Sequence, residues 1–69
     1  MSLEKRSVSL SGHRTSIALE PAFWAALEAI AAARSTSLPA LIASIDDARS
    51  PDDALASALR VFALTMRGS

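Results

Sequence analysis

The segment from Arg14 to Pro21 constrains the fold of this chain more than any other part. It follows a period-two pattern, RTSIAL, and then reaches Pro21, where a helical apolar pattern begins. In a strand, successive side chains point to opposite faces, which separates two sets: Thr15, Ile17 and Leu19 on one face, and Arg14, Ser16 and Ala18 on the other. One strand cannot pair its own backbone groups, so it needs a partner strand from this chain or from a second copy.

The length and composition predict a single domain over residues 1–69 that is completed by self-association. A chain of 69 residues buries only a modest apolar core by itself. The chain has no cysteine and one histidine, which excludes disulfides and makes a structural zinc site a poor fit. An apolar fraction of 51% is high for so small a monomer. We therefore expect a homodimer that uses no metal and no cofactor.

The basic side chains gather near the N-terminus although the formal net charge is zero. Residues 1–19 carry three basic and one acidic side chain, a sum of +2, whereas residues 20–69 carry four and six, a sum of −2. This excess of basic side chains near the N-terminus weakly indicates nucleic-acid binding. No apolar run reaches the length of a membrane span, and no signal-peptide pattern is present. The expected setting is the bacterial cytoplasm.

A second strand is suggested before the first. Residues 7–10 alternate, with Val8 and Leu10 on one side, and Ser11-Gly12-His13 is a turn signal. Residues 7–19 thus read as a hairpin, although the pattern at 7–10 is short and leaves this strand open. Residues 1–6 are polar and are expected to form a mobile arm.

Three helices are predicted, over residues 21–34, 38–49 and 51–67. Pro21 suits a first helical turn, and Ser37 is a good N-cap for the second helix. Ser50-Pro51-Asp52-Asp53 also fits a helix start, with a capping serine, a proline and acidic residues in the first turn. The apolar spacing predicts a core or dimer interface made by Thr15, Ile17, Leu19, Trp24, Leu27, Leu41, Ile42 and Ile45.

The sequence contains no constellation of catalytic residues. It has no cysteine nucleophile, no second histidine, no tyrosine and no glycine-rich phosphate loop. The four aspartates lie at predicted helix ends, where capping explains them better than a cation site. The protein is therefore not expected to be an enzyme.

The order strand, helix, short turn, serine-capped helix resembles the ribbon-helix-helix family of MetJ/Arc-type DNA-binding proteins. The resemblance is carried by residues 14–45, above all by RTSIAL, by the apolar stripe through Trp24 and Leu27, and by SLPALI from Ser37. Over its whole length the chain is similar to short bacterial members with an added C-terminal helix. The fold class expected from this likeness is mainly α: an N-terminal strand or hairpin and three helices, in an intertwined homodimer.

The resemblance implies that two strands, one from each subunit, form an antiparallel ribbon that enters the major groove of double-stranded DNA. Arg14, Ser16 and Ala18 would then face the bases, and Ser37 and Leu38 would offer backbone N–H groups to a phosphate. His13, Lys5 and Arg6 are further candidates for DNA contact. Ser35 stands where the family has glycine or asparagine in a left-handed conformation.

Three functions remain open. The first is a transcriptional repressor; the second is a dimerisation or adaptor module that has lost DNA binding. A strand at residues 7–10 bears on this choice, because the dimer sheet would have four strands and be wider than the groove accepts. The third is an antitoxin whose C-terminal helix contacts a protein toxin.

Overall fold

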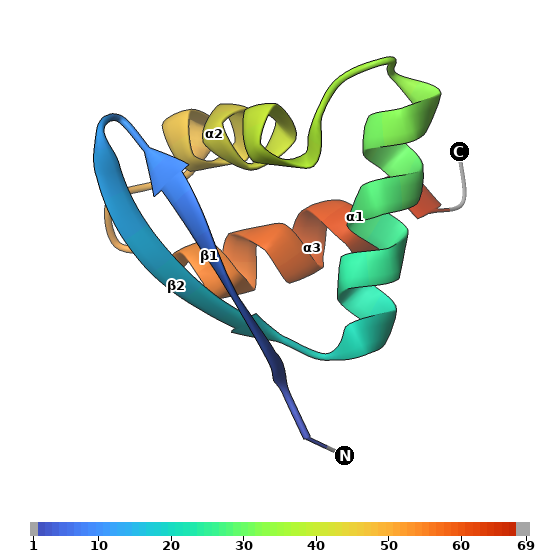
Figure 1. Ribbon diagram of the computed structural model, residues 1–69, viewed down its shortest axis with the longest axis horizontal. Coiled ribbons are helices and arrows are strands. Elements are labelled where there is room, and N and C mark those ends of the chain that lie inside the picture. Colours follow the sequence, from blue (N-terminus) through green and yellow to red (C-terminus); the bar gives the residue numbers. More distant parts are fainter. Residues whose placement is uncertain (1, 68–69) are drawn as a thin grey trace.

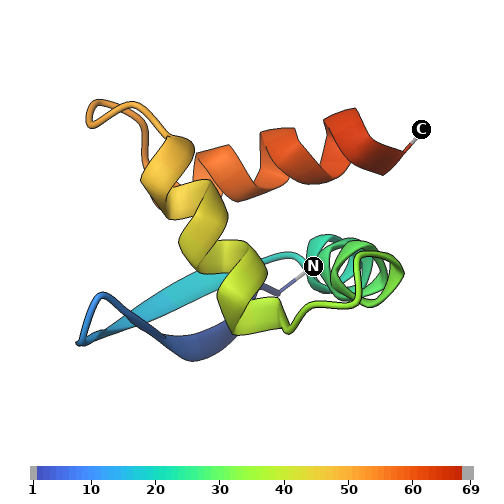
Figure 2. The same cartoon turned by 90° about the horizontal axis from the view of Figure 1, so that it is seen from above.

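Two antiparallel strands precede three helices in the computed structural model, which describes residues 2–67 (Figure 1). The elements are β1 (Glu4–Leu10), β2 (His13–Leu19), α1 (Pro21–Ala33), α2 (Leu38–Ala48) and α3 (Leu55–Arg67). The hairpin and α3 lie on opposite sides of the molecule, and α2 runs between them (Figure 2). The predicted order of strand, second strand and three helices is confirmed.

The hairpin turns at Ser11 and Gly12, whose φ angles are 50° and 81°. Two positive φ values at the central residues define a type I′ turn, whose twist matches that of the flanking strands. Glycine reaches this conformation without a Cβ clash, and no atom lies within 4 Å of a Cβ built at Gly12. The turn fixes the register, in which Leu10 lies opposite His13 and Glu4 lies opposite Leu19.

β1 is longer than the predicted strand. It begins at Glu4, so residues 4–6 are strand residues and not part of a mobile arm, as the sequence had suggested. The reason is tertiary: the indole N–H of Trp24 donates a hydrogen bond of 2.8 Å to the carbonyl of Glu4 and ties this end of the strand to α1. Met1, the first residue of the expected arm, lies outside the described residues.

The partner of β2 comes from the same chain. β1 pairs with it along the full length of both strands, so β2 does not need a second copy for this edge. This removes one of the two reasons for expecting an intertwined homodimer. The dimer itself stays a prediction.

The core lies between the hairpin and the three helices. The side chains of Leu19, Trp24, Leu27, Ile42 and Leu59 are completely inaccessible to solvent. Of the eight residues predicted for the core or dimer interface, seven are buried, and Thr15 is half-buried on the same face as Ile17. α3 completes the core within the chain through Leu59 and Ala63.

The helix starts at Pro21 and Leu38 agree with the cap signals. Ser37 Oγ accepts a hydrogen bond of 3.2 Å from the Ala40 N–H, as an N-cap should. Ser35, between α1 and α2, has a φ of 54°, the left-handed conformation predicted for this position. α1 and α2 each end one residue before the predicted position.

The predicted start of the third helix at residue 51 is wrong, because α3 begins at Leu55. Ser50 closes a turn instead, since its carbonyl accepts the Asp53 N–H at 3.0 Å. A guanidinium N–H of Arg49 donates to the Asp53 carbonyl at 2.7 Å and to that of Ser50 at 3.4 Å. Arg49 therefore holds residues 50–53 as a turn, although a serine followed by proline and two acids also fits a helix start.

Candidate nucleic-acid interface

Six side chains share the solvent-facing side of the hairpin, which we call the outer face. Three cross-strand pairs build it: Lys5 with Ala18, Ser7 with Ser16, and Ser9 with Arg14. Five of the six residues are exposed, and Ala18 is half-buried. The opposite side of the hairpin carries the buried residues Val8, Leu10, Ile17 and Leu19, so the period-two alternation separates the two faces cleanly.

The outer face is basic. Lys5 and Arg14 are its charged members, and none of the six residues is acidic, which gives a sum of +2. The Lys5 and Arg14 pairs are four positions apart along the hairpin, or about 14 Å at the rise of a strand. Between them lie three serine hydroxyls, which can donate to and accept from phosphates or base edges. The face therefore suits a polyanion with hydrogen-bonding groups.

Four of the predicted contact residues, Arg14, Ser16, Ala18 and Lys5, lie together on this face. Ser7 and Ser9 were not predicted as site residues. The signal for them was present, because the alternation that puts Val8 and Leu10 on one side puts these serines on the other. What the sequence lacked was the register that sets them opposite Ser16 and Arg14.

Arg6 lies on the other side of the hairpin from Lys5. Its guanidinium pairs with Glu4 and, at 3.0 Å, with Glu28 of α1, and it stacks 4.8 Å from the ring centroid of Trp24. The hydrogen bond to Glu4, followed by that to Glu28, raises the pKa of Arg6 above its ordinary value. The structure thus uses this predicted contact residue to fasten the hairpin to α1.

His13 is exposed beside the turn, opposite Leu10. By alternation it belongs to the side of the hairpin that carries Leu10, so it flanks the outer face at the tip and is not one of its members.

The start of α2 offers few free donors. Pro39 has no N–H, and the Ala40 N–H is bonded to Ser37 Oγ, which leaves the Leu38 N–H among the first three helical residues. Ser37 is exposed and Leu38 half-buried. α2 begins on the side of the molecule where the hairpin lies and runs toward α3 (Figure 2). Ser37 and Leu38 thus lie on the hairpin side, although outside the outer face.

The free edge of β2 is formed by residues of the outer face. Leu10 and His13 close the turn and hence exchange main-chain hydrogen bonds with each other. Along antiparallel strands, hydrogen-bonded pairs alternate with pairs that are not hydrogen-bonded, so every second residue of β2 after His13 makes no main-chain bond to β1. The main-chain groups of Arg14, Ser16 and Ala18 therefore point away from β1. This edge would be the one available to a strand of a second copy.

The chain matches the model of the ribbon-helix-helix domain over residues 3–66. It belongs to the ribbon-helix-helix family. Members of this family are typically dimeric, non-catalytic, DNA-binding regulators. Neither the curated proteins nor the solved structures contain a match to the chain.

Residues 2–67 contain no group of three or more potential metal ligands. None of the three helices is both long and apolar enough to cross a membrane.

Proposed function

We propose that this protein is a homodimeric DNA-binding regulator, a transcriptional repressor, whose own β1–β2 hairpin is the ribbon that enters the major groove. The observation that carries the proposal is the outer face. It is exposed, has a charge of +2 without a carboxylate, and lies on an antiparallel two-stranded ribbon. Membership of a family of typically DNA-binding regulators supports it.

The dimensions of one hairpin suit the groove. Its two strands are about 4.8 Å apart, and the major groove of B-form DNA is about 12 Å wide. Arg14 can donate two hydrogen bonds to a guanine, and Ser16 can contact any base. Ala18 can only make an apolar contact, such as one with the methyl group of a thymine. Lys5, at the far end of the face, is suited to a phosphate.

A phosphate contact at the start of α2 would extend this interface. The Leu38 N–H is the donor that capping leaves for it, and the positive end of the helix dipole adds to the attraction. Ser37 contributes indirectly, because its side chain is already bonded to Ala40.

The alternative function is an adaptor module on the same fold without DNA binding. The intrachain hairpin favours it if two copies pair through the free edges of β2. Such a sheet has four strands and measures about 14 Å between the axes of its outer strands, which exceeds the width of the groove. An adaptor would use the same sheet as a contact surface between copies.

Binding to the DNA upstream of the protein's own gene distinguishes these functions. We expect Arg14→Ala to weaken binding at least tenfold at fixed salt, because one bidentate contact is worth about 1–3 kcal/mol and a dimer has two. Fluorescence anisotropy measures the change. The melting temperature should stay that of the parent, since Arg14 is exposed on the outer face.

Thr15→Ala is the matched control. Thr15 is the neighbouring residue on the opposite face and is half-buried, so its loss should lower the melting temperature and leave the affinity unchanged. An Arg14→Ala variant that binds as tightly as the parent would show that the outer face does not read DNA, and the adaptor function would then be preferred.

A further inference from the structure

The two strands of the hairpin carry the same pattern of side chains, repeated at an interval of nine residues. β1 reads EKRSVSL and β2 reads HRTSIAL. From its second position onward, each strand has a basic residue, another polar residue, a serine, a β-branched aliphatic residue, a small residue and a leucine. Exposure follows the repeat, because in both strands the basic residue and the serine are exposed, whereas the aliphatic residue and the leucine are buried. One chain therefore contributes two similar strands to the hairpin.

The register of the hairpin turns this repeat into a two-fold relation. In an antiparallel pair, a local two-fold axis perpendicular to the sheet passes between residues that lie opposite each other. It exchanges the strands and keeps every side chain on its own face. The axis between Ser7 and Ser16, the central residues of the two strands, moves each residue nine positions along the chain. The residues that it exchanges on the outer face are Lys5 with Arg14, Ser7 with Ser16, and Ser9 with Ala18.

Double-stranded DNA has axes of the same kind. Its two strands are antiparallel, so a protein element with two-fold symmetry contacts equivalent positions on both of them, and its binding site is an inverted repeat. We propose, on the basis of the proposed DNA-binding function, that a single hairpin reads a short, imperfect inverted repeat. Lys5 contacts a base in one half of the repeat, as Arg14 does in the other half. One chain thus contains both halves of the reading element.

Lys5 is equipped for the same contact as Arg14. Both residues are exposed on the outer face, and within residues 2–67 neither is paired with a carboxylate. Arginine and lysine are the residues that most often contact guanine in the major groove. A phosphate would suit the charge of Lys5 as well, but the two-fold relation gives this residue the position that Arg14 has in the other half. Their separation of about 14 Å along the hairpin corresponds to about four base-pair steps.

The two halves are similar and not identical. Arginine presents a planar fork that bonds guanine through two N–H groups, whereas lysine presents a compact charge on a flexible stem. Ser9 can exchange hydrogen bonds with a base edge, whereas Ala18 can make only an apolar contact. The repeat should therefore be imperfect, with the stronger base preference in the half that Arg14 reads.

Selection of bound duplexes from a random DNA library, at fixed salt, tests the proposal in the full chain. The parent should select a guanine in each half of the repeat, on opposite DNA strands and about four base-pair steps apart. Arg14→Ala and Lys5→Ala should each lose the preference in one half and keep it in the other, and the double variant should keep neither. On the duplex that the parent selects, Lys5→Ala should bind more weakly by about fivefold or more.

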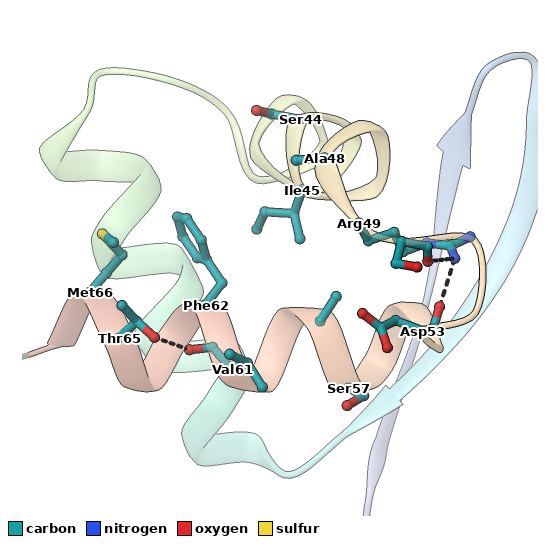
Figure 3. Close-up of a pocket in the computed structure, with 12 residues that line it drawn as sticks. Ser44, Ile45, Ala48, Arg49, Asp53, Ser57, Val61, Phe62, Thr65 and Met66 are labelled. Carbon is teal, nitrogen blue, oxygen red and sulfur yellow. Dashed lines mark hydrogen bonds between the residues drawn. The ribbon is translucent and has the colours of Figure 1, made fainter.

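Ser57→Glu is the matched control for charge. It changes the net charge by the same amount as Lys5→Ala, but at an exposed residue of α3, which lies on the side of the molecule opposite the hairpin (Figure 2). Ser57 lines a groove between α2 and α3, outside the outer face (Figure 3). This variant should select the same repeat as the parent.

A symmetrised hairpin sharpens the test. Lys5→Arg combined with Ser9→Ala makes the outer-face residues of the two strands identical. Both positions are exposed, so the melting temperature should stay that of the parent. This variant should select a perfect inverted repeat, because its two halves offer the same groups to the DNA.

Two results would overturn the proposal and leave the DNA-binding function intact. An inverted repeat could also arise if two copies pair through the free edges of β2, with Arg14 of each copy reading one half. Arg14→Ala would then erase both halves at once, and Lys5→Ala would erase neither. Alternatively, Lys5→Ala would weaken binding to every duplex alike, as the loss of a phosphate contact does. A parent chain that selects no sequence would instead overturn the DNA-binding function and this proposal together.

Discussion

The hairpin and α3 are alike on their inner faces and different on their outer faces. Both bury aliphatic side chains in the same core, where Leu19 and Leu59 are completely inaccessible. Outside, the hairpin presents Lys5, Arg14 and serines, whereas α3 presents Val61 and Leu64. The inner faces explain the fold, and the outer faces suit different partners. A charged, hydroxyl-rich surface suits a polyanion, and an uncharged one suits another uncharged surface.

α1 connects the two regions by similar devices. On the hairpin side, Arg6 stacks on Trp24 and pairs with Glu28. On the α3 side, Arg60 lies 5.9 Å from the ring centroid of Phe23 and pairs with Glu20 at 2.9 Å. Each device combines a guanidinium, an aromatic ring and a carboxylate. Substitutions on each side of the molecule show whether the hairpin side and the α3 side depend equally on these devices.

The largest effect is expected on the inner face of α3. Leu59→Ala removes a fully buried side chain and should lower the free energy of unfolding by about 2–5 kcal/mol. Urea denaturation followed by circular dichroism measures it. Leu64→Ala, on the outer face of the same helix, is the control and should change stability by no more than about 0.5 kcal/mol. Equal losses from the two variants would contradict the division of α3 into a structural and an exposed face.

Local sequence signals predicted the parts of the fold that local contacts determine. Pro21 and Ser37 marked helix starts because a proline or a capping serine stabilises the first turn whatever lies around it. The same reasoning failed at Ser50. There the side chain of Arg49 holds the carbonyls of Ser50 and Asp53, a contact that the sequence of the turn does not reveal.

The hairpin, too, depends on contacts that local sequence signals do not reveal. Residues 4–6 are too polar to predict as a strand, and their conformation depends on Trp24 and Glu28, more than 17 residues away in the chain. For the candidate site, the alternation at 14–19 predicted Arg14, Ser16 and Ala18 as one face. Ser7 and Ser9 joined that face only when the type I′ turn had fixed the register.

The two arginine devices should differ in strength. Arg6→Ala removes a stacking contact at 4.8 Å and two ion pairs with carboxylates. We expect it to lower the free energy of unfolding by about 1 kcal/mol. Arg60→Ala removes a longer contact at 5.9 Å and one carboxylate, so its loss should be smaller. Urea midpoints compare the two variants.

Arg6→Lys separates charge from stacking. Lysine keeps the positive charge but lacks the planar guanidinium, so it should recover only part of the lost stability. Full recovery of stability would show that stacking on Trp24 contributes nothing beyond the ion pairs of Arg6. If Arg60→Ala lost more stability than Arg6→Ala, the α3 side would depend on its arginine more than the hairpin side does, contrary to the prediction.

The smallest effect is expected from acid on the α3 side. The backbone amide of Glu20, and then the guanidinium of Arg60, lower the pKa of Glu20 below its ordinary value. A carboxyl whose pKa is lower in the folded state stabilises the fold above its unfolded pKa, about 4.3, and this contribution is lost as the pH falls through the folded pKa. Because the group is exposed to solvent and salt screens the pair, the loss should be slight. Urea midpoints between pH 7 and pH 3 measure it, with Glu20→Gln as the comparison. The variant lacks this titrating group, so its midpoint should fall less steeply over the acid range than that of the parent. Parallel curves for the two proteins would mean that the ion pair between Glu20 and Arg60 does not stabilise the α3 side, which would then depend on packing contacts such as that of Arg60 over Phe23.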